Sequence, residues 1–168
     1  METNLYPVSV PVFERMLRNL ITCLDKAQAH AQARGFSPDA YLALRLAPDM
    51  LPFTKQIHIA GDSAKAALSR LAGREVPKWD DDETTLAQLR ARIQRTIDHV
   101  VSFGPEDLAG AATREVSVPM RNRDPLVFRG DAYLCHYALP NFYFHLTTAY
   151  ALLRQAGVPL GKSDYLGG

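Results

Sequence analysis

The sequence predicts an all-α four-helix bundle with one small β-hairpin before the last helix. Two observations carry this prediction: four segments of about 20–27 residues show apolar side chains at helical spacing, and a single stretch changes to an alternating period. A chain of 168 residues is long enough to bury one core, so we expect residues 1–168 to form a single domain.

The first predicted helix follows Pro11 and ends at Gly35. Its apolar stripe consists of Phe13, Met16, Leu17, Leu20, Ile21, Leu24, Ala27 and Ala31. Ser37 is then placed to cap a short helix that runs through Leu44.

The second long helix is expected to begin with Asp49 as its cap and Pro52 in its first turn, and to end at Gly73. Its apolar stripe consists of Phe53, Ile57, Ala60, Ala64, Leu68 and Leu71.

The third helix is expected to open at Thr84 or Thr85 and to end at Gly104-Pro105. Its inward side chains are Leu86, Leu89, Ile93, Ile97 and Val100. The acidic run DDDE at residues 80–83 precedes this helix, where negative charge suits the helix dipole.

A hairpin is predicted at residues 114–130, where REVSVPM alternates before a polar turn and PLVFRG. Asp131 is placed to cap the fourth long helix, which is expected to stop at Gly157. Its apolar stripe consists of Leu134, Ala138, Phe142, Ala149 and Leu152.

The linker lengths bear on the topology of the bundle. The roughly 11 residues between the second and third helices span about 36 Å when extended, which is also the length of a helix of about 24 residues. The linker can therefore run the length of the bundle and leave these two helices parallel. An up-down-up-down order with short loops is the alternative.

Composition narrows the range of functions. The formal net charge of +1, from 19 basic and 18 acidic residues, argues against a nucleic-acid-binding protein. Two cysteines outside any CxxC spacing predict a reduced, cytoplasmic protein. The sequence shows neither a signal-peptide pattern nor an uncharged apolar run of about 18 residues, so no membrane partner is expected.

Polar side chains interrupt the apolar stripe of the fourth helix. Asn141 and His145 are four residues apart and therefore stack on one face, and Pro140 is expected to bend the helix beside them. On the second helix, His58 and Asp62 are also four residues apart, at the shoulder of the stripe. These four residues predict a divalent-metal or small-ligand site in the bundle core, with His145 at its centre and Asp62 in reserve.

The histidines also have structural interpretations. His145 could be a core residue that needs a hydrogen-bond partner, because an unsatisfied buried polar group costs about 1–3 kcal/mol. His58 could simply meet solvent at the shoulder of the second helix. The chain shows no P-loop, Rossmann glycine pattern or GxSxG motif that would indicate another chemistry.

Three stretches of the chain are distinctive: YPVSVPVFERMLRNL, RLAPDMLPFTKQIHIAGDSAK and YLCHYALPNFYFHLTTAYALLRQAGVPLGKSDYLG. They resemble a bacterial family of unknown function within the DinB-like superfamily of four-helix bundles, and the likeness runs over nearly the whole chain. The resemblance implies a DinB-like fold with parallel second and third helices, and often a homodimer. It also implies a metal-dependent small-molecule or thiol transferase.

The superfamily holds a divalent metal through one histidine on the second helix and an H-x-x-x-H pair on the last bundle helix. By position, the pair falls on Asn141 and His145, so an asparagine replaces the first histidine, and the other ligand falls within residues 58–62. The resemblance thus implies nickel or zinc at His145, with Asn141, His58 or Asp62 as further ligands, or no metal at all.

Three function classes follow: a metal-dependent enzyme, a small-molecule-binding protein that has lost the metal, and a dimeric scaffold with a structural Asn–His network. A homodimer is expected from the resemblance. It is also expected because one helical stripe cannot bury the three consecutive aromatics Phe142, Tyr143 and Phe144.

Overall fold

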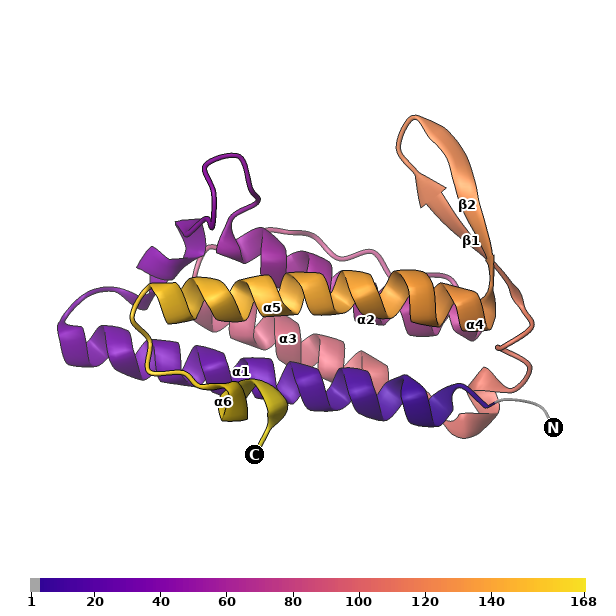
Figure 1. Cartoon of the computed structure of the whole chain (residues 1–168), viewed down its shortest axis with the longest axis horizontal. Coiled ribbons are helices and arrows are strands. Elements are labelled where there is room, and N and C mark those ends of the chain that lie inside the picture. Colours follow the sequence, from indigo (N-terminus) through magenta and orange to yellow (C-terminus); the bar gives the residue numbers. More distant parts are fainter. Residues whose placement is uncertain (1–3) are drawn as a thin grey trace.

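Four long helices form a bundle in the computed structural model, which describes residues 4–168 (Figure 1). The long helices are α1 (Val10–Arg34), α2 (Phe53–Leu71), α3 (Leu86–Val101) and α5 (Leu139–Gln155). The last of these continues from α4 (Gly130–Tyr133) through a π-helical turn, η4 (Leu134–Ala138). The short elements are η1 (Tyr6–Val8), η2 (Pro38–Ala43), η3 (Pro105–Leu108) and α6 (Lys162–Leu166). The predicted all-α bundle is confirmed.

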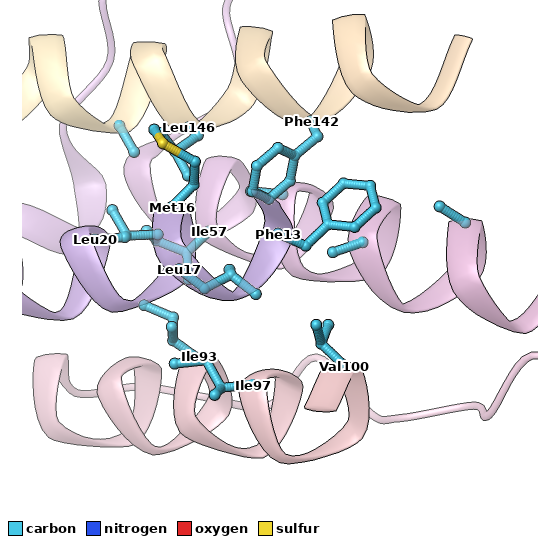
Figure 2. Close-up of a cluster of buried hydrophobic side chains, with 14 of the residues drawn as sticks. Phe13, Met16, Leu17, Leu20, Ile57, Ile93, Ile97, Val100, Phe142 and Leu146 are labelled. Atoms are coloured by element: carbon cyan, nitrogen blue, oxygen red, sulfur yellow. The ribbon is translucent and has the colours of Figure 1, made fainter. Parts of the chain in front are cut away.

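The core lies where α1, α2, α3 and α5 turn their apolar faces toward one another. Figure 2 shows side chains from these helices meeting at the centre, with Phe13 and Phe142 close together. The rings of Phe13 and Phe142 pack edge to face, with centroids 4.9 Å apart. The four predicted apolar stripes are buried, apart from Ile21, which is partly buried.

Several helix ends follow local sequence signals. Gly35 ends α1 in the left-handed conformation, at φ 73°. Ser37 caps η2, and Thr85 forms a capping box with Gln88 at the start of α3.

The start of α2 differs from the prediction. The helix begins at Phe53, with Pro52 in the cap position, and Asp49 caps nothing. The reason is Leu51: a residue before proline is driven out of the helical region, so a helix cannot pass through Leu51 into Pro52 here. The segment turns instead, and the Phe53 N–H donates to the Leu44 carbonyl.

α2 and α3 run in the same direction, as the linker length and the resemblance predicted. The linker at residues 72–85 returns along the bundle between them (Figure 1). His58, near the start of α2, lies beside Glu83, just before α3, whereas Ser69, near the end of α2, lies beside His99. The short-loop alternative is therefore excluded.

The predicted hairpin is present as β1 (Glu115–Met120) paired antiparallel with β2 (Arg123–Arg129). The pairing places Val116 opposite Phe128, and the register shifts at Pro119, where the strand lacks a backbone donor. The hairpin projects from the end of the bundle at which α4 begins (Figure 1).

The fourth long helix begins at Gly130, one residue before the cap predicted at Asp131. The Asp131 carboxylate lies in the first turn, where it accepts from the Ala132 N–H. Gly130 is required because a Cβ atom there would collide with the Ala111 carbonyl oxygen.

The bend expected at Pro140 takes the form of the π-helical turn that precedes it. Pro140 has no N–H to donate to His136, and its ring would crowd that carbonyl. The chain widens by one residue, so the Leu139 N–H donates to Leu134. This turn and the hairpin together border the site described below.

None of the helices formed by residues 4–168 combines the length and the apolar character that a membrane span requires.

Candidate functional site

His145 is held in one tautomer by α2. Its Nδ1 lies 2.7 Å from Oε1 of Gln56, a side chain that is 1% exposed. The Gln56 amide nitrogen donates to the Leu51 carbonyl at 3.0 Å, which leaves Oε1 as an acceptor. His145 therefore donates from Nδ1, and when the ring is neutral its lone pair is at Nε2. Burial lowers the pKa of His145, which favours this neutral form.

Asn141 lies one turn before His145 and contacts α2 separately. Its amide nitrogen donates to the Ser63 hydroxyl at 3.3 Å. No hydrogen bond joins Asn141 to His145 in the described chain. The expected Asn–His network is therefore two independent links between α5 and α2.

His58 faces a different side of α2. It is two residues from Gln56, which places the two side chains about 200° apart around the helix. The His58 ring is 1% exposed, with Nε2 2.7 Å from a Glu83 carboxylate oxygen and Nδ1 3.4 Å from Asp81. Within the described residues, neither nitrogen has a well-aligned hydrogen bond at these distances. The structure does not bring His58 to His145.

Asp62 lies between a group of buried charged side chains and solvent. Its carboxylate lies 2.7 Å from Lys65 Nζ and 3.5 Å from the Arg92 guanidinium. Lys65 and Arg92 are buried, whereas the Asp62 side chain is 45% exposed. Asp62 is therefore accessible from solvent, while its negative charge is balanced by the two buried cations, Lys65 and Arg92.

The residues present do not fit a nickel or zinc centre. Beside the single imidazole of His145 stand the neutral amides of Gln56 and Asn141, which are poor ligands for these metals. Around His58, Arg92 already pairs with the carboxylates of Asp81 and Glu83. Within residues 4–168, no three His, Cys, Asp or Glu side chains are grouped so that they could hold a metal ion.

Two of the four predicted residues line an open cavity that sequence reasoning did not anticipate. It has a volume of about 260 Å³ and lies between α2, the α4–η4–α5 helix and the hairpin; we call it the hairpin chamber. Its polar lining consists of Asp62, Ser63, Arg70, Tyr133, Tyr137 and Asn141. His58 and His145 do not line it.

A second cavity, of about 380 Å³, lies next to the first along α2; we call it the linker chamber. It shares Asp62, Ala66 and Arg70 with the hairpin chamber, and we call the two adjacent cavities together the α2 groove. The linker chamber adds Lys65 and a wall from residues 76–79 that ends in Trp79.

Arg70 is the main functional candidate that sequence reasoning missed. Asp62, Ala66 and Arg70 are spaced four apart, so a small residue lies between two charges on the polar face of α2. This spacing was a readable signal. The tyrosines opposite could not be found in the same way, because the hairpin and the π-helical turn place them there.

Comparison with known proteins gave a family and a solved structure. A family model described as a domain of unknown function, DUF1993, matches residues 5–166. A crystal structure of a DinB family member protein from Shewanella denitrificans is 43% identical, with a TM-score of 0.90 over 98% of this chain and 92% of that chain. No curated protein matches the sequence.

Proposed function

The chain belongs to the DUF1993 family, a DinB-like family of unknown function, and we propose that it binds a small organic molecule in the α2 groove. The observation that carries the proposal is the convergence of Arg70, Asp62 and Asn141 on one open cavity. A cavity lined by apolar and aromatic side chains with a few polar groups is the usual form of a ligand site.

The polar side chains in the hairpin chamber can still form hydrogen bonds to a ligand. The described contacts of Arg70 include one side-chain hydrogen bond, from its guanidinium to the Tyr133 hydroxyl at 3.1 Å. The bond from Asn141 to Ser63 is long, at 3.3 Å, and both side chains are partly exposed. A ligand that enters the chamber can therefore replace water on several donors without breaking a strong internal bond.

The donor chemistry favours an organic ligand over a metal ion. The groove offers a guanidinium, two ammonium groups, tyrosine rings and one amide, which suit an organic molecule. Among the residues that the structure describes, Asp62 supplies the one lining carboxylate, and this carboxylate already contacts Lys65.

A catalytic use of the same site is the second candidate, and His145 supports it. Its neutral ring carries a lone pair at Nε2, and it lies one helical turn from Asn141, which lines the hairpin chamber, although His145 itself does not line it. A histidine with a fixed tautomer is suited to general-base chemistry. In that case His145→Gln would remove turnover of a bound molecule while leaving its affinity nearly unchanged.

A thermal-shift screen of small metabolites tests the proposed site through Ala66→Trp. Ala66 lines both chambers, so an indole at this position fills them without removing a charge. Ala91→Trp, on the exposed face of α3, is the matched control. We expect compounds that raise the melting temperature of the wild type and of Ala91→Trp but not of Ala66→Trp. Equal stabilisation of all three proteins, or no stabilising compound at all, contradicts the proposal.

A further inference from the structure

We infer that the ligand of the α2 groove is a small organic anion whose carboxylate or phosphate is bound by Arg70. This inference rests on the proposed function and adds the chemical class of the ligand. It follows from the charge balance of the groove, from the position of Arg70 between the two chambers, and from the aromatic side chains on either side of Arg70.

Arg70 carries a charge that its described surroundings do not balance. No carboxylate lies within ion-pair distance of its guanidinium in the part of the chain from residue 4 onward. Its partner, the Tyr133 hydroxyl, stays neutral, because burial raises the pKa of Tyr133 above its ordinary value. The remaining guanidinium N–H groups have the planar fork geometry that binds carboxylates and phosphates.

Asp62, the one acidic residue among the described residues that line the groove, does not neutralise Arg70. Its carboxylate is shared by Lys65, at 2.7 Å, and Arg92, at 3.5 Å, and both of these cations are buried. The linker chamber then holds three cationic side chains, Lys65, Arg70 and Lys78, against this single carboxylate. A concave site with an excess of one charge attracts ligands of the opposite charge.

Aromatic rings flank Arg70 in both chambers and indicate a planar apolar part of the ligand. In the hairpin chamber, the rings of Tyr133 and Tyr137 are nearly parallel, at 21°, with centroids 6.0 Å apart. In the linker chamber, the Trp79 ring has the Lys65 ammonium 4.3 Å from its centroid. The Tyr133 ring is buried and Tyr137 is partly exposed, so an anion held at Arg70 would place a planar group against the Tyr137 side of the tyrosine pair.

Calorimetric titration with four probes tests the inference. Benzoate and phenyl phosphate carry the two anionic groups, benzyl alcohol is a neutral analogue, and benzylamine is a cationic analogue. We expect both anions to bind the wild type about tenfold or more tighter than benzyl alcohol and benzylamine. The reason is that neither the alcohol nor the amine can form the charged hydrogen bonds with Arg70. A preference for phenyl phosphate over benzoate, or the reverse, identifies which anion the site prefers.

Three variants test whether the preference for anions depends on Arg70. Arg70→Gln should weaken anion binding about tenfold or more and leave benzyl alcohol unchanged, and Arg70→Lys should give an intermediate loss, because it keeps the charge without the fork. Arg95→Gln is the control: Arg95 also lies over Trp79, at 4.2 Å, but it does not line the groove, so anion binding should persist. Circular dichroism checks that each variant is folded.

The failures of the inference and of the proposed function are distinguishable. If the alcohol or the amine binds as tightly as the anions, or if Arg70→Gln binds benzoate normally, the inference is overturned. An equal loss in Arg95→Gln also overturns it, because the effect would then be one of overall charge. Binding of no probe to the wild type overturns it too, and the metabolite screen against Ala66→Trp decides the proposed function on its own.

Discussion

His145 owes its orientation to a chain of two hydrogen bonds that begins at the Leu51 carbonyl and passes through Gln56. The spacing of residues predicted that Asn141 and His145 share a face, and they do. Spacing could not predict the partner, because the residue of α2 that meets His145 depends on how the two helices are rotated against each other. A search for metal ligands does not select Gln56 either, because an amide is a poor ligand for nickel or zinc.

Replacing His145 by alanine should lower the free energy of unfolding by about 1–3 kcal/mol. The reason is that Oε1 of the buried Gln56 loses its donor. Asn141→Ala is the comparison and should cost less than about 1 kcal/mol, because its bond to Ser63 is long and partly exposed. Urea denaturation measures both variants, and equal losses would show that Gln56 finds another partner.

Asn141→His should strengthen nickel or zinc binding, because it adds an imidazole one turn from His145 and recreates the H-x-x-x-H pair of the superfamily. One added nitrogen ligand should raise affinity about tenfold or more, which is about 1.4 kcal/mol. Calorimetric titration compares the wild type, Asn141→His, and Asn141→His combined with His145→Ala, and the last should lose the gain. No gain in a folded Asn141→His protein would mean that the superfamily metal site has no counterpart in this chain.

At the scale of elements, the periodic stripes predicted the four helices and their buried faces, while the departures come from two prolines. Leu51 precedes Pro52 and delays the start of α2, and Pro140 produces the π-helical turn before α5. The acidic run before α3 was assigned to the helix dipole. Asp81 and Glu83 instead turn inward to Arg92, a contact between residues that no periodicity connects.

Arg92 should hold the 72–85 linker against α2 and α3, because it is 5% exposed and pairs with Asp81 and Glu83 at 3.0 and 3.1 Å. Arg92→Met removes the cation beside the nearly buried Glu83 carboxylate, while Asp81 keeps its pair with Lys55, and should cost about 3–5 kcal/mol of stability. Arg90→Met is the control and should cost less than about 1 kcal/mol, because its pair with Asp25 is exposed. The two midpoints in urea should differ clearly, and similar values would mean that the buried group contributes no more than a surface pair.

At the scale of the whole molecule, the groove is assembled from segments that lie far apart in the sequence. Tyr133 and Tyr137 come from the region of the π-helical turn, Val118 from the hairpin, and Trp79 from the long linker. Periodicity assigns faces to helices but does not say what covers an exposed face. For this reason the aromatic neighbours of Arg70 could not be predicted, whereas the spacing of Asp62, Ala66 and Arg70 on α2 was readable from the sequence.

We predict a homodimer in solution. Of the three consecutive aromatics, Phe142 is buried and Tyr143 partly buried, but Phe144 is 57% exposed, with its ring centroid 5.1 Å from that of His145. A large exposed aromatic is a frequent contact residue in interfaces. Light scattering at micromolar concentration should give twice the chain mass of 18.7 kDa, and Phe144→Ser should shift the protein toward monomer. A mass of 18.7 kDa for the wild type at all dilutions would rule out the dimer.

The measurement that tests the central claim most directly is an NMR titration of the isotope-labelled wild-type protein with benzoate. The claim is that the chain binds a small organic anion in the α2 groove. The predicted result is a saturable set of amide shifts centred on Asp62, Ala66 and Arg70 and extending to Asn141, lost in Ala66→Trp. Shifts that centre on Gln56 and His145, that spread over the surface without saturating, or that persist in Ala66→Trp would contradict it.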